Sequence, residues 1–493
     1  MKSALKDILI IGSGLGGLAT ALRLASLGHR VRILEKHSTP GGRLNQFKDK
    51  GFTFDLGPSF MSMTFEFDEL FKDCGIPNPL KLKELDPLYE VNFRGSNKTF
   101  KIWKDLHKLS NEFKDIEPNF EEKAKKYLKR AGEFYHDTEE KVIKSNFNNL
   151  LDYFIKISTV PKKHLPFLRK KLWTLLEETF DSIEVKVIFS LVSFFLGSTP
   201  FETPSIYSLL NYTELKHNGY WAVKGGMYKI VEEILIALKK LGVEVICNTE
   251  VKAIANYNGT VKTVIDNNGK EWKAEIYIVN ADAAAFRGKV LNRTKYTDEK
   301  LDKMNWSLAP FTIYLGLKNK ISSLNHHNYF LGNDFTKYAE KIFTSDSIPT
   351  NPYYYVNMPS YSDPTCTPDG CENLFILCPV PDLRYKKNWS DKELFEKNII
   401  NDLSERINYD INGNTVVKRT LTPSDWETMF NLYKGSGLGL SHGMNQIGGF
   451  RPSNKDEKFP NVFYVGASTV PGTGLPMVLI SSKLVTERIL NEL

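Results

Sequence analysis

The feature that most constrains this chain is a glycine turn between two apolar strands near its first residue. An apolar run at residues 8–11 precedes the turn, and a helical pattern leads from it to a second apolar run at 31–34. Gly12, Gly14 and Gly17 fill the three positions of G-x-G-x-x-G. They permit a tight turn, let a pyrophosphate approach the backbone, and let helix and strand pack closely. The helix N-terminus then directs free N–H groups toward the phosphates.

An acidic residue closes the second strand. Glu35 lies 23 residues after Gly12, where a carboxylate can bind a ribose diol. Leu15 and Gly16 of the turn, and Lys36 beside Glu35, are further candidate contacts. The order of strand, turn, helix, strand and acid predicts a dinucleotide site. The alternative is a glycine-rich turn that holds no ligand.

A second glycine pair follows in Pro40-Gly41-Gly42-Arg43. It brings backbone close to the cofactor, and Arg43 can meet a phosphate or a nearby acidic group; the alternative is a surface turn with a solvated arginine. The block resembles the second fingerprint of large flavoproteins in the amine-oxidase and carotenoid-desaturase superfamily. That resemblance implies FAD rather than NAD. It also implies cofactor contacts at Gly42, Arg43, Gly57, Pro58 and Ser59.

The C-terminal segment carries the other half of the resemblance. Residues 461–467 form a buried-strand pattern that ends in Gly466-Ala467, and residues 471–480 read as a turn that runs into a helix. In flavoproteins of this superfamily that strand returns to the first domain, and the helix start lies at the flavin ring, where its N–H groups would stabilise the reduced flavin. Many members have Gly-Asp at this point, whereas Gly-Ala is characteristic of carotenoid desaturases. The implied contacts are Val251, Gly466, Ala467, Gly474, Leu475, Pro476 and Met477.

Central segments at 203–210, 219–227, 280–282 and 446–452 fit the same pattern in the same order. Over most of its length the chain resembles the bacterial phytoene desaturase family, which comprises FAD-dependent carotenoid desaturases and their isomerase relatives. The resemblance implies an α/β fold with a Rossmann-type FAD-binding domain like those of glutathione reductase and the amine oxidases. A second, mixed-sheet substrate domain and a helical, membrane-facing subdomain are expected beside it.

The length of 493 residues suggests two or three domains. Residues 1–85, 215–290 and 441–493 are predicted to form a discontinuous FAD-binding domain. Residues 86–214 are helical in pattern and rich in lysine, and residues 291–440 are predicted to form the substrate domain.

Charge is unevenly placed along the chain, whose formal net charge is +7. Residues 153–176 contain six Lys or Arg and no Asp or Glu, interleaved with apolar and aromatic side chains. Such a mixture suits an anionic membrane surface; the alternative is a solvated basic face over a buried helix. No recognition motif accompanies the basic residues, so nucleic acid is not an expected partner.

Three further observations bear on localisation. No run of about 18 apolar residues would span a bilayer, and the first strand begins too early to leave room for a signal peptide. Five scattered cysteines argue against a disulfide framework and against a zinc site. We therefore expect a cytoplasmic protein that is peripheral on the inner face of the cell membrane.

The resemblance implies that the protein introduces C=C bonds into a carotenoid by hydride transfer from an allylic carbon to flavin N5, followed by proton loss. The substrate is either phytoene or a later hydroxylated or monocyclic carotene, as in hydroxycarotenoid and gamma-carotene 3,4-desaturases. A flavin-dependent isomerase and a non-catalytic lipid-binding relative are the alternatives. No metal site and no catalytic residue is assigned: Asp282 and Arg451 are expected to be structural, and His442 a loop residue. The electron acceptor is oxygen or a quinone.

Overall fold

A parallel five-stranded sheet holds the two ends of the chain together. The computed structural model describes residues 5–96 and 98–492. The strand order is β19 (Val462–Tyr464), β13 (Ile276–Val279), β1 (Asp7–Ile11), β2 (Arg30–Leu34) and β9 (Glu244–Ile246). These strands are short apolar runs covered by structure on both faces, as is usual for parallel sheets. Three segments that are distant in the sequence therefore build one sheet.

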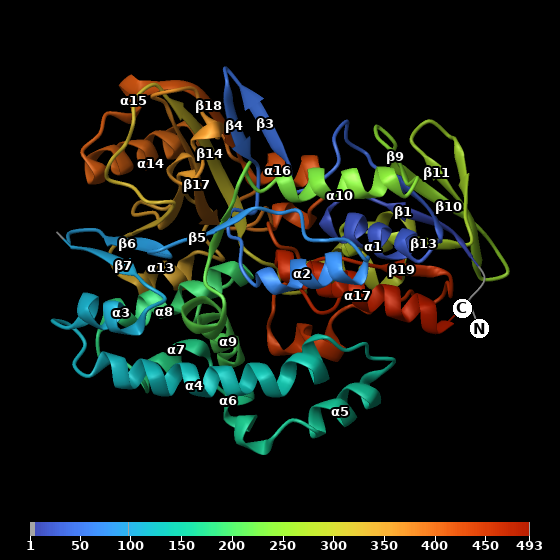
Figure 1. Cartoon of the computed structure of the whole chain (residues 1–493), viewed down its shortest axis with the longest axis horizontal. Coiled ribbons are helices and arrows are strands. Elements are labelled where there is room, and N and C mark those ends of the chain that lie inside the picture. Colours follow the sequence, from blue (N-terminus) through green and yellow to red (C-terminus); the bar gives the residue numbers. More distant parts are fainter. Residues whose placement is uncertain (1–4, 97, 493) are drawn as a thin grey trace.

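Helix α1 (Leu15–Ser26) lies against this sheet and is almost entirely buried. It packs against α17 (Leu475–Glu492) and α10 (Lys229–Lys240), and α2 (Thr64–Asp73) packs against α17 (Figure 1). An antiparallel sheet of β10 (Val251–Tyr257), β11 (Thr260–Asp266) and β12 (Glu271–Lys273) stands beside them. Two short pairs complete this part: β3 (Gln46–Asp49) with β4 (Phe52–Asp55), and β5 (Leu82–Glu84) with β8 (Trp221–Val223).

The second large sheet is mixed and has seven strands. Its order is β18 (Thr415–Leu421), β14 (Ala309–Leu317), β17 (Glu372–Val380), β16 (Tyr354–Asn357), β15 (His327–Leu331), β6 (Tyr89–Phe93) and β7 (Thr99–Ile102). Phe311 and Ile313 on β14 share a core with Phe395 and Leu403 of α14 (Lys392–Ile407), which covers one face.

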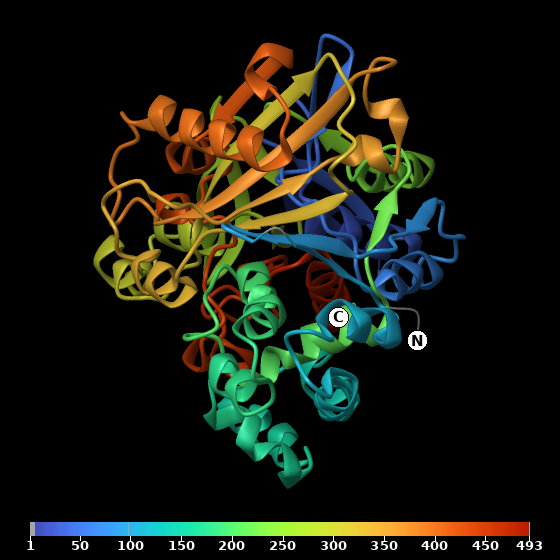
Figure 2. The ribbon, with the colours of Figure 1, turned by 90° about the vertical axis from the view of Figure 1, so that its left-hand side faces the viewer.

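A group of helices lies beneath this sheet in Figure 2. It comprises α3 (Leu106–Phe113), α4 (Phe120–Thr138), α5 (Leu150–Ser158), α6 (Leu165–Arg169), α7 (Leu172–Glu177), α8 (Ile183–Ser190) and α9 (Ser208–Tyr212). The helical pattern begins only at Leu106, not at residue 86, because 89–93 and 99–102 form β6 and β7. Apolar and polar residues alternate along β7, and that period of two is typical of a strand with one buried face.

Shorter helices join these parts: α11 (Ala283–Ala285), α12 (Asp298–Asp302), α13 (Phe335–Lys341), α15 (Ile411–Asn414) and α16 (Pro423–Phe430). Within the described residues, no helix is long and apolar enough to cross a membrane. In the same part of the chain, no group of three or more His, Cys, Asp or Glu side chains could hold a metal ion. All five cysteines are free.

Candidate cofactor and substrate site

The glycine turn between β1 and α1 is closed by contacts that leave no room for side chains. Gly12 has a φ of +97°, and a Cβ there would lie 2.9 Å from the backbone oxygen of Asn280. A Cβ on Gly17 would lie 2.3 Å from the oxygen of Gly12, so Gly17 lets helix and strand pack together. Gly14 caps α1 without any side-chain hydrogen bond, which leaves the first N–H groups of the helix free for an anion.

Asn280, directly after β13, binds the backbone of the glycine turn between β1 and α1. Its Nδ2 donates hydrogen bonds to the carbonyl oxygens of Gly12 at 3.2 Å and Gly14 at 3.1 Å. The sequence pattern marks Asn280 only as part of a weak central segment. Its position at the carboxyl end of a strand beside β1 is the signal that could have identified this role.

Glu35 is buried at the end of β2, and its carboxylate is already oriented. One carboxylate oxygen accepts a hydrogen bond from the Ser13 N–H at 2.8 Å, and the other accepts one from the His37 N–H at 2.9 Å. Ser13 lies inside the glycine turn, so the carboxylate and the turn are tied to each other. This is the geometry expected for an acidic residue that binds a ribose beside a pyrophosphate.

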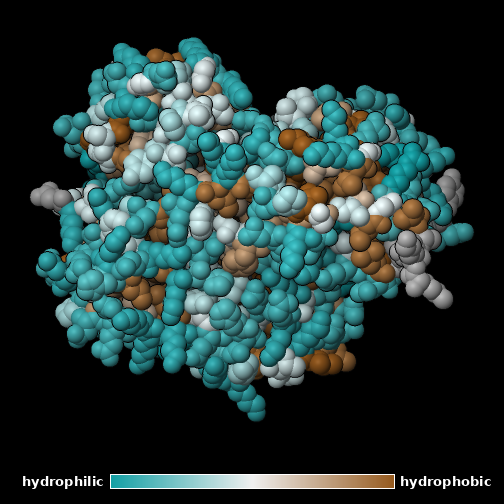
Figure 3. Space-filling view, viewed as in Figure 1, coloured by the Kyte–Doolittle hydropathy of each residue, from teal (hydrophilic) through white to brown (hydrophobic). Residues whose placement is uncertain are grey.

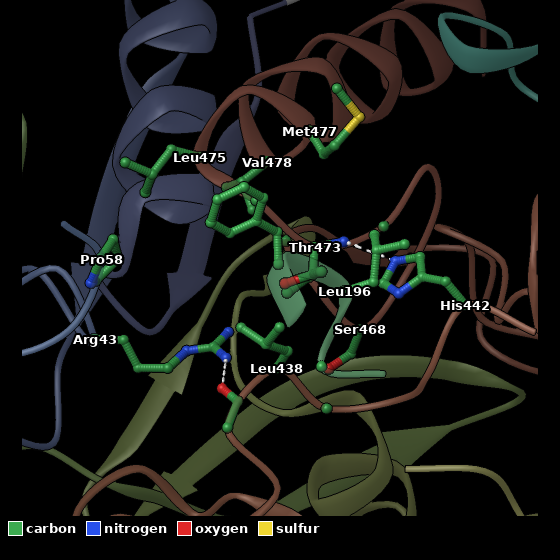
Figure 4. A pocket seen from close by; sticks show the side chains of 18 of the residues that line it. Arg43, Pro58, Leu196, Leu438, His442, Ser468, Thr473, Leu475, Met477 and Val478 are labelled. Atoms are coloured by element: carbon green, nitrogen blue, oxygen red, sulfur yellow. Dashed lines mark hydrogen bonds between the residues drawn. The ribbon is translucent and has the colours of Figure 1, made fainter. Parts of the chain in front are cut away.

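The second glycine pair packs directly on the first. Gly41 forms a parallel bridge with Gly14, and a Cβ on Gly42 would lie 3.1 Å from the Gly14 Cα. Arg43 then extends into the cavity, where its Nη1 donates to the Gly437 carbonyl oxygen at 2.7 Å (Figure 4). Burial lowers the pKa of Arg43, and the nearby Asp282 carboxyl opposes that shift. Arg43 is thus not a solvated surface residue.

The C-terminal segment supplies another wall of the cavity. Gly466, with a φ of +104°, follows β19, and the turn before α17 lies along the cavity with Leu475, Met477 and Val478 at the helix start (Figure 4). The His442 Nε2 accepts a hydrogen bond from the Thr473 N–H at 3.2 Å. Burial lowers the pKa of His442 far below its ordinary value, and the neighbouring Arg451 adds to the effect.

Arg451 and Asp282 both form hydrogen bonds with the backbone, and Asp282 also lines the cavity. The Arg451 guanidinium donates hydrogen bonds to backbone carbonyls of two separate segments, including Thr469 at 2.9 Å and Ala467 at 2.7 Å. Asp282 accepts a hydrogen bond from the Ala285 N–H at 2.9 Å. His442 is more than a loop residue, because it supports the turn that leads into α17. It is also a poor base, since the Nε2 lone pair is engaged with Thr473.

These segments surround one continuous cavity of about 1050 Å³. Its lining includes Gly12, Gly14, Leu15, Gly16, Glu35, Lys36, Gly42, Arg43, Gly57, Pro58, Ser59, Val251, Gly466, Ala467, Gly474, Leu475, Pro476 and Met477. Gly17 is absent from the lining because it packs against Gly12. The remaining walls are mostly aliphatic and aromatic side chains from α4, α5, α6 and α9, from residues 191–197, and from β14 to β17.

The glycine cradle, the free helix N-terminus and the oriented Glu35 fit a dinucleotide such as FAD, and comparison with known proteins identifies the group. Residues 15–490 match the family described as flavin containing amine oxidoreductase. The chain belongs to this family. Its cofactor is therefore FAD, as the second glycine pair implies.

Among the relatives of this flavin amine oxidoreductase is the zeta-carotene-forming phytoene desaturase of Myxococcus xanthus. It is 33% identical over 98% of this chain and 94% of its own length. The carotenoid 3,4-desaturase of Haloarcula japonica is 27% identical over 99% of both chains. The structure of a putrescine oxidase superimposes with a TM-score of 0.64 at 13% identity, covering 99% of each chain, which shows a shared fold.

Proposed function

We propose that this protein is an FAD-dependent carotenoid desaturase that introduces C=C bonds into an acyclic or partly acyclic carotenoid. The observation that carries the proposal is the single cavity, which joins the nucleotide cradle to a long chamber with apolar walls. The names of its relatives support the same substrate class. A cavity lined in this way suits a long hydrocarbon chain, because burying apolar surface drives binding.

When bound, FAD would supply the oxidant for removal of a hydride from an allylic carbon. Gly12, Gly14, Glu35 and the turn before α17 would hold it. The apolar walls of the cavity exclude water and orient the polyene. The conjugated polyene spreads the positive charge that precedes proton loss, which lowers the need for a strong base.

Several titratable side chains line the cavity, among them Asp282 and His442. His442 lines it, but burial lowers its pKa and Thr473 occupies its Nε2.

The test is to purify the protein, measure its flavin absorbance, and supply phytoene or lycopene. Loss of two hydrogens per new double bond, with a red-shifted pigment, is the expected result. A product with the mass of its substrate would favour the isomerase, and a protein that binds no flavin after reconstitution would overturn both enzymatic assignments. Omitting oxygen and adding a soluble quinone distinguishes the two electron acceptors.

We also propose the domain division given by the sequence, with β6 and β7 assigned to the substrate domain because they extend its sheet. The segment around α5 and α6 is proposed as a peripheral membrane surface on the cytoplasmic side. Leu151, Phe154 and Ile155 have 70%, 52% and 57% of their surfaces exposed. Figure 3 shows hydrophobic residues at the lower edge of the molecule, where α5 lies.

Two features of this segment support the membrane proposal. Lys162 and Arg169 are exposed beside the apolar residues and would favour anionic headgroups. Ile157 and Leu168 of the same segment line the cavity, so an apolar substrate could pass between the bilayer and the cavity without crossing water.

Vesicle sedimentation tests this surface. The double variant Leu151→Glu and Phe154→Glu should lose binding to phosphatidylglycerol-containing vesicles and keep its FAD. Leu27→Glu is the matched control, because Leu27 is 51% exposed at the end of α1, away from α5. Equal sedimentation of the double variant and the control would contradict the proposal.

A further inference from the structure

Four buried tyrosines gather where the seven-stranded sheet meets the cavity. Tyr89 on β6, Tyr329 on β15, Tyr355 on β16 and Tyr220 before β8 form this tyrosine cluster. Tyr329 stands in the middle, with its ring centroid 5.4 Å from those of both Tyr89 and Tyr355. Tyr220, Tyr329 and Tyr355 line the cavity, whereas Tyr89 does not. The cluster thus connects the cavity with the core behind its wall.

A buried carboxyl adjoins the tyrosine cluster. Glu214 lies in the π-helical turn Thr213–His217 and is 2% exposed. Its Oε1 has no hydrogen-bond partner within the described residues, although most buried polar atoms in folded proteins are paired. Turns of this kind are rare and are frequently found at functional sites. An unpaired buried oxygen is costly, so a carboxyl with a purely structural role is not expected to carry one.

The Tyr220 hydroxyl links this carboxyl to the cavity. The hydroxyls of Tyr89 and Tyr220 both interact with the Glu214 carboxyl. An ionised carboxylate only accepts hydrogen bonds, so Tyr220 donates its proton to Glu214 and keeps the lone pairs of its own oxygen for another donor. Because Tyr220 lines the cavity and Glu214 does not, Tyr220 is the group through which a substrate communicates with the carboxyl.

Tyr220 also lies beside the predicted FAD contacts. Its ring centroid is 4.9 Å from that of Phe60, which lines the same cavity. Phe60 directly follows the predicted contacts at 57–59 in the chain. The Tyr220 hydroxyl therefore borders the part of the cavity in which oxidation of the substrate is expected.

Two other titratable groups of the cavity are already engaged. Asp282 accepts hydrogen bonds from the Ala285 N–H at 2.9 Å and from the Ser468 hydroxyl at 3.2 Å. His442 accepts one from the Thr473 N–H at 3.2 Å. The buried carboxyl behind the tyrosine cluster differs from both, because one of its oxygens has no partner within the described residues.

The surroundings of Glu214 suit a weak base. Burial raises its pKa to about 7, and the hydroxyls of Tyr89 and Tyr220 oppose that shift. Tyr127 of α4 and Tyr329 of β15 also lie near it, and both stay neutral because burial raises their pKa values. A carboxyl whose pKa is close to the operating pH is an effective proton acceptor.

We propose that Glu214 accepts the proton that the substrate loses, and that the Tyr220 hydroxyl carries this proton from the cavity. Removal of a hydride, for which bound FAD is the oxidant, leaves a cation on the polyene. The adjacent C–H bond then breaks, and its electron pair becomes the new C=C bond. Its proton goes to the Tyr220 oxygen, while the Tyr220 proton passes to the Glu214 carboxylate. This inference rests on the proposed function and identifies the groups that complete its reaction.

The first experiment follows the pH dependence of kcat/KM with phytoene and with lycopene. In the wild type, kcat/KM should rise with pH through about 7, because the carboxylate must be ionised to take the proton. Glu214→Gln should lose this dependence and about 100-fold in kcat, while FAD content and KM are retained. Glu244→Gln, at an exposed position on β9, is the matched control and should keep the wild-type profile. A Glu214→Gln protein with the wild-type profile would overturn the inference.

Two tyrosine variants separate proton transfer from packing. Tyr220→Phe removes the hydroxyl between the cavity and Glu214, so kcat should fall as in Glu214→Gln, and combining both changes should cause no further loss. Tyr89→Phe removes the other hydroxyl at Glu214, outside the cavity lining. It should keep the maximal rate and move the pH dependence to higher pH, because an interaction with the ionised carboxylate is lost. Equal loss of kcat in the two tyrosine variants would mean that both hydroxyls serve only packing, and would overturn the inference.

Infrared titration of the FAD-loaded protein decides the inference without turnover. The band of the protonated Glu214 carboxyl, identified by its absence in Glu214→Gln, should disappear as pH rises through about 7. A band that persists at about pH 9, the upper range for buried glutamates, would overturn the inference. Absence of desaturation of both carotenoids, beside a carboxyl that titrates as expected, counts only against the proposed function.

Discussion

The cavity has two parts: a nucleotide cradle, formed by the glycine turns at 12–17 and 41–42, and an apolar chamber, formed by the helices and strands that line the rest of it. Backbone atoms form the walls of the first part, and side chains form the walls of the second. The cradle is made of backbone: Gly12, Gly14 and Gly42 approach neighbouring atoms so closely that a Cβ would not fit without movement. The chamber is made of side chains from helices and strands that are distant in the sequence. A glycine whose backbone touches its neighbours cannot be replaced by a residue with a side chain, whereas a packed apolar side chain can be replaced by another of similar volume. The cradle should therefore determine the cofactor, and the chamber the substrate.

The largest effect is expected from Gly12→Ala. Alanine at a φ of +97° is strained, and its Cβ would lie 2.9 Å from the Asn280 oxygen, so the turn must open. We expect at least a tenfold loss of bound FAD, estimated as about 1–3 kcal/mol of backbone strain plus the steric clash. The visible flavin absorbance per protein measures it.

Gly242→Ala is the control that separates backbone strain from the steric clash expected in Gly12→Ala. Gly242 has a φ of +74° but nothing within 4 Å of a Cβ. This variant should lose about 1 kcal/mol of stability and keep its FAD. Equal FAD loss in both variants would show that close packing of the cradle is not the reason.

A smaller effect is expected from Glu35→Gln. The carboxylate accepts hydrogen bonds from Ser13 and His37, and an amide would direct an N–H group toward one of these donors. Hydrogen bonds to charged groups contribute about 1.5–3 kcal/mol, so FAD affinity should fall about ten- to hundredfold on reconstitution of the apoprotein. Glu244→Gln, at an exposed position on β9, should leave the affinity unchanged; an equal loss there would refute the role of Glu35.

This contrast also explains how much the sequence reveals. The cradle is local: Gly12 to Glu35 form one strand–turn–helix–strand unit whose spacing is readable, and eighteen of the nineteen predicted contacts line the cavity. Asn280 is harder to recognise, because its role depends on β13 pairing with β1 across the whole chain.

The chamber is not local at all. Tyr220, Tyr329 and Tyr355 come together only because β15 and β16 pair in the same sheet and the segment before β8 crosses it. No spacing in the sequence marks them. Strand β6 pairs with β15, more than two hundred residues away, whereas its hairpin with β7 is local, and the period of two along β7 is a signal in the sequence itself. Burial of Glu214 likewise depends on these tertiary contacts.

A pH dependence follows from the buried carboxyls of the chamber region. Burial raises the pKa of Asp55 from 3.8 to about 6 and that of Glu214 from 4.5 to about 7. The folded protein thus binds protons that the unfolded chain releases. This contribution to stability is complete below the unfolded pKa values and is lost as pH rises through about 6 to 7. The melting temperature should fall between about pH 5 and about pH 8.

Glu214→Gln sharpens this prediction. In this variant, the free energy of unfolding should no longer change with pH through Glu214. That contribution is at most about 3 kcal/mol, because one pKa unit corresponds to about 1.4 kcal/mol. Glu244→Gln should melt with the wild-type slope. A Glu214→Gln protein with an unchanged slope would mean that the carboxyl is solvated in solution.

The smallest effect is expected from Tyr207→Phe, which removes one polar atom from the chamber outside the tyrosine cluster. Tyr207 lines the cavity, its ring lies 6.0 Å from that of His442, and burial raises its pKa, so the hydroxyl stays neutral. Phenylalanine keeps nearly the same volume, so FAD should be retained and kcat/KM for a carotenoid should change less than about fivefold. A hundredfold loss would place Tyr207 in the chemistry and would break the contrast between an intolerant cradle and a tolerant chamber. A small change in kcat/KM for Tyr207→Phe, together with an at least tenfold loss of bound FAD in Gly12→Ala, would support the contrast. Both residues line the same cavity and differ in whether backbone or side chain makes the contact.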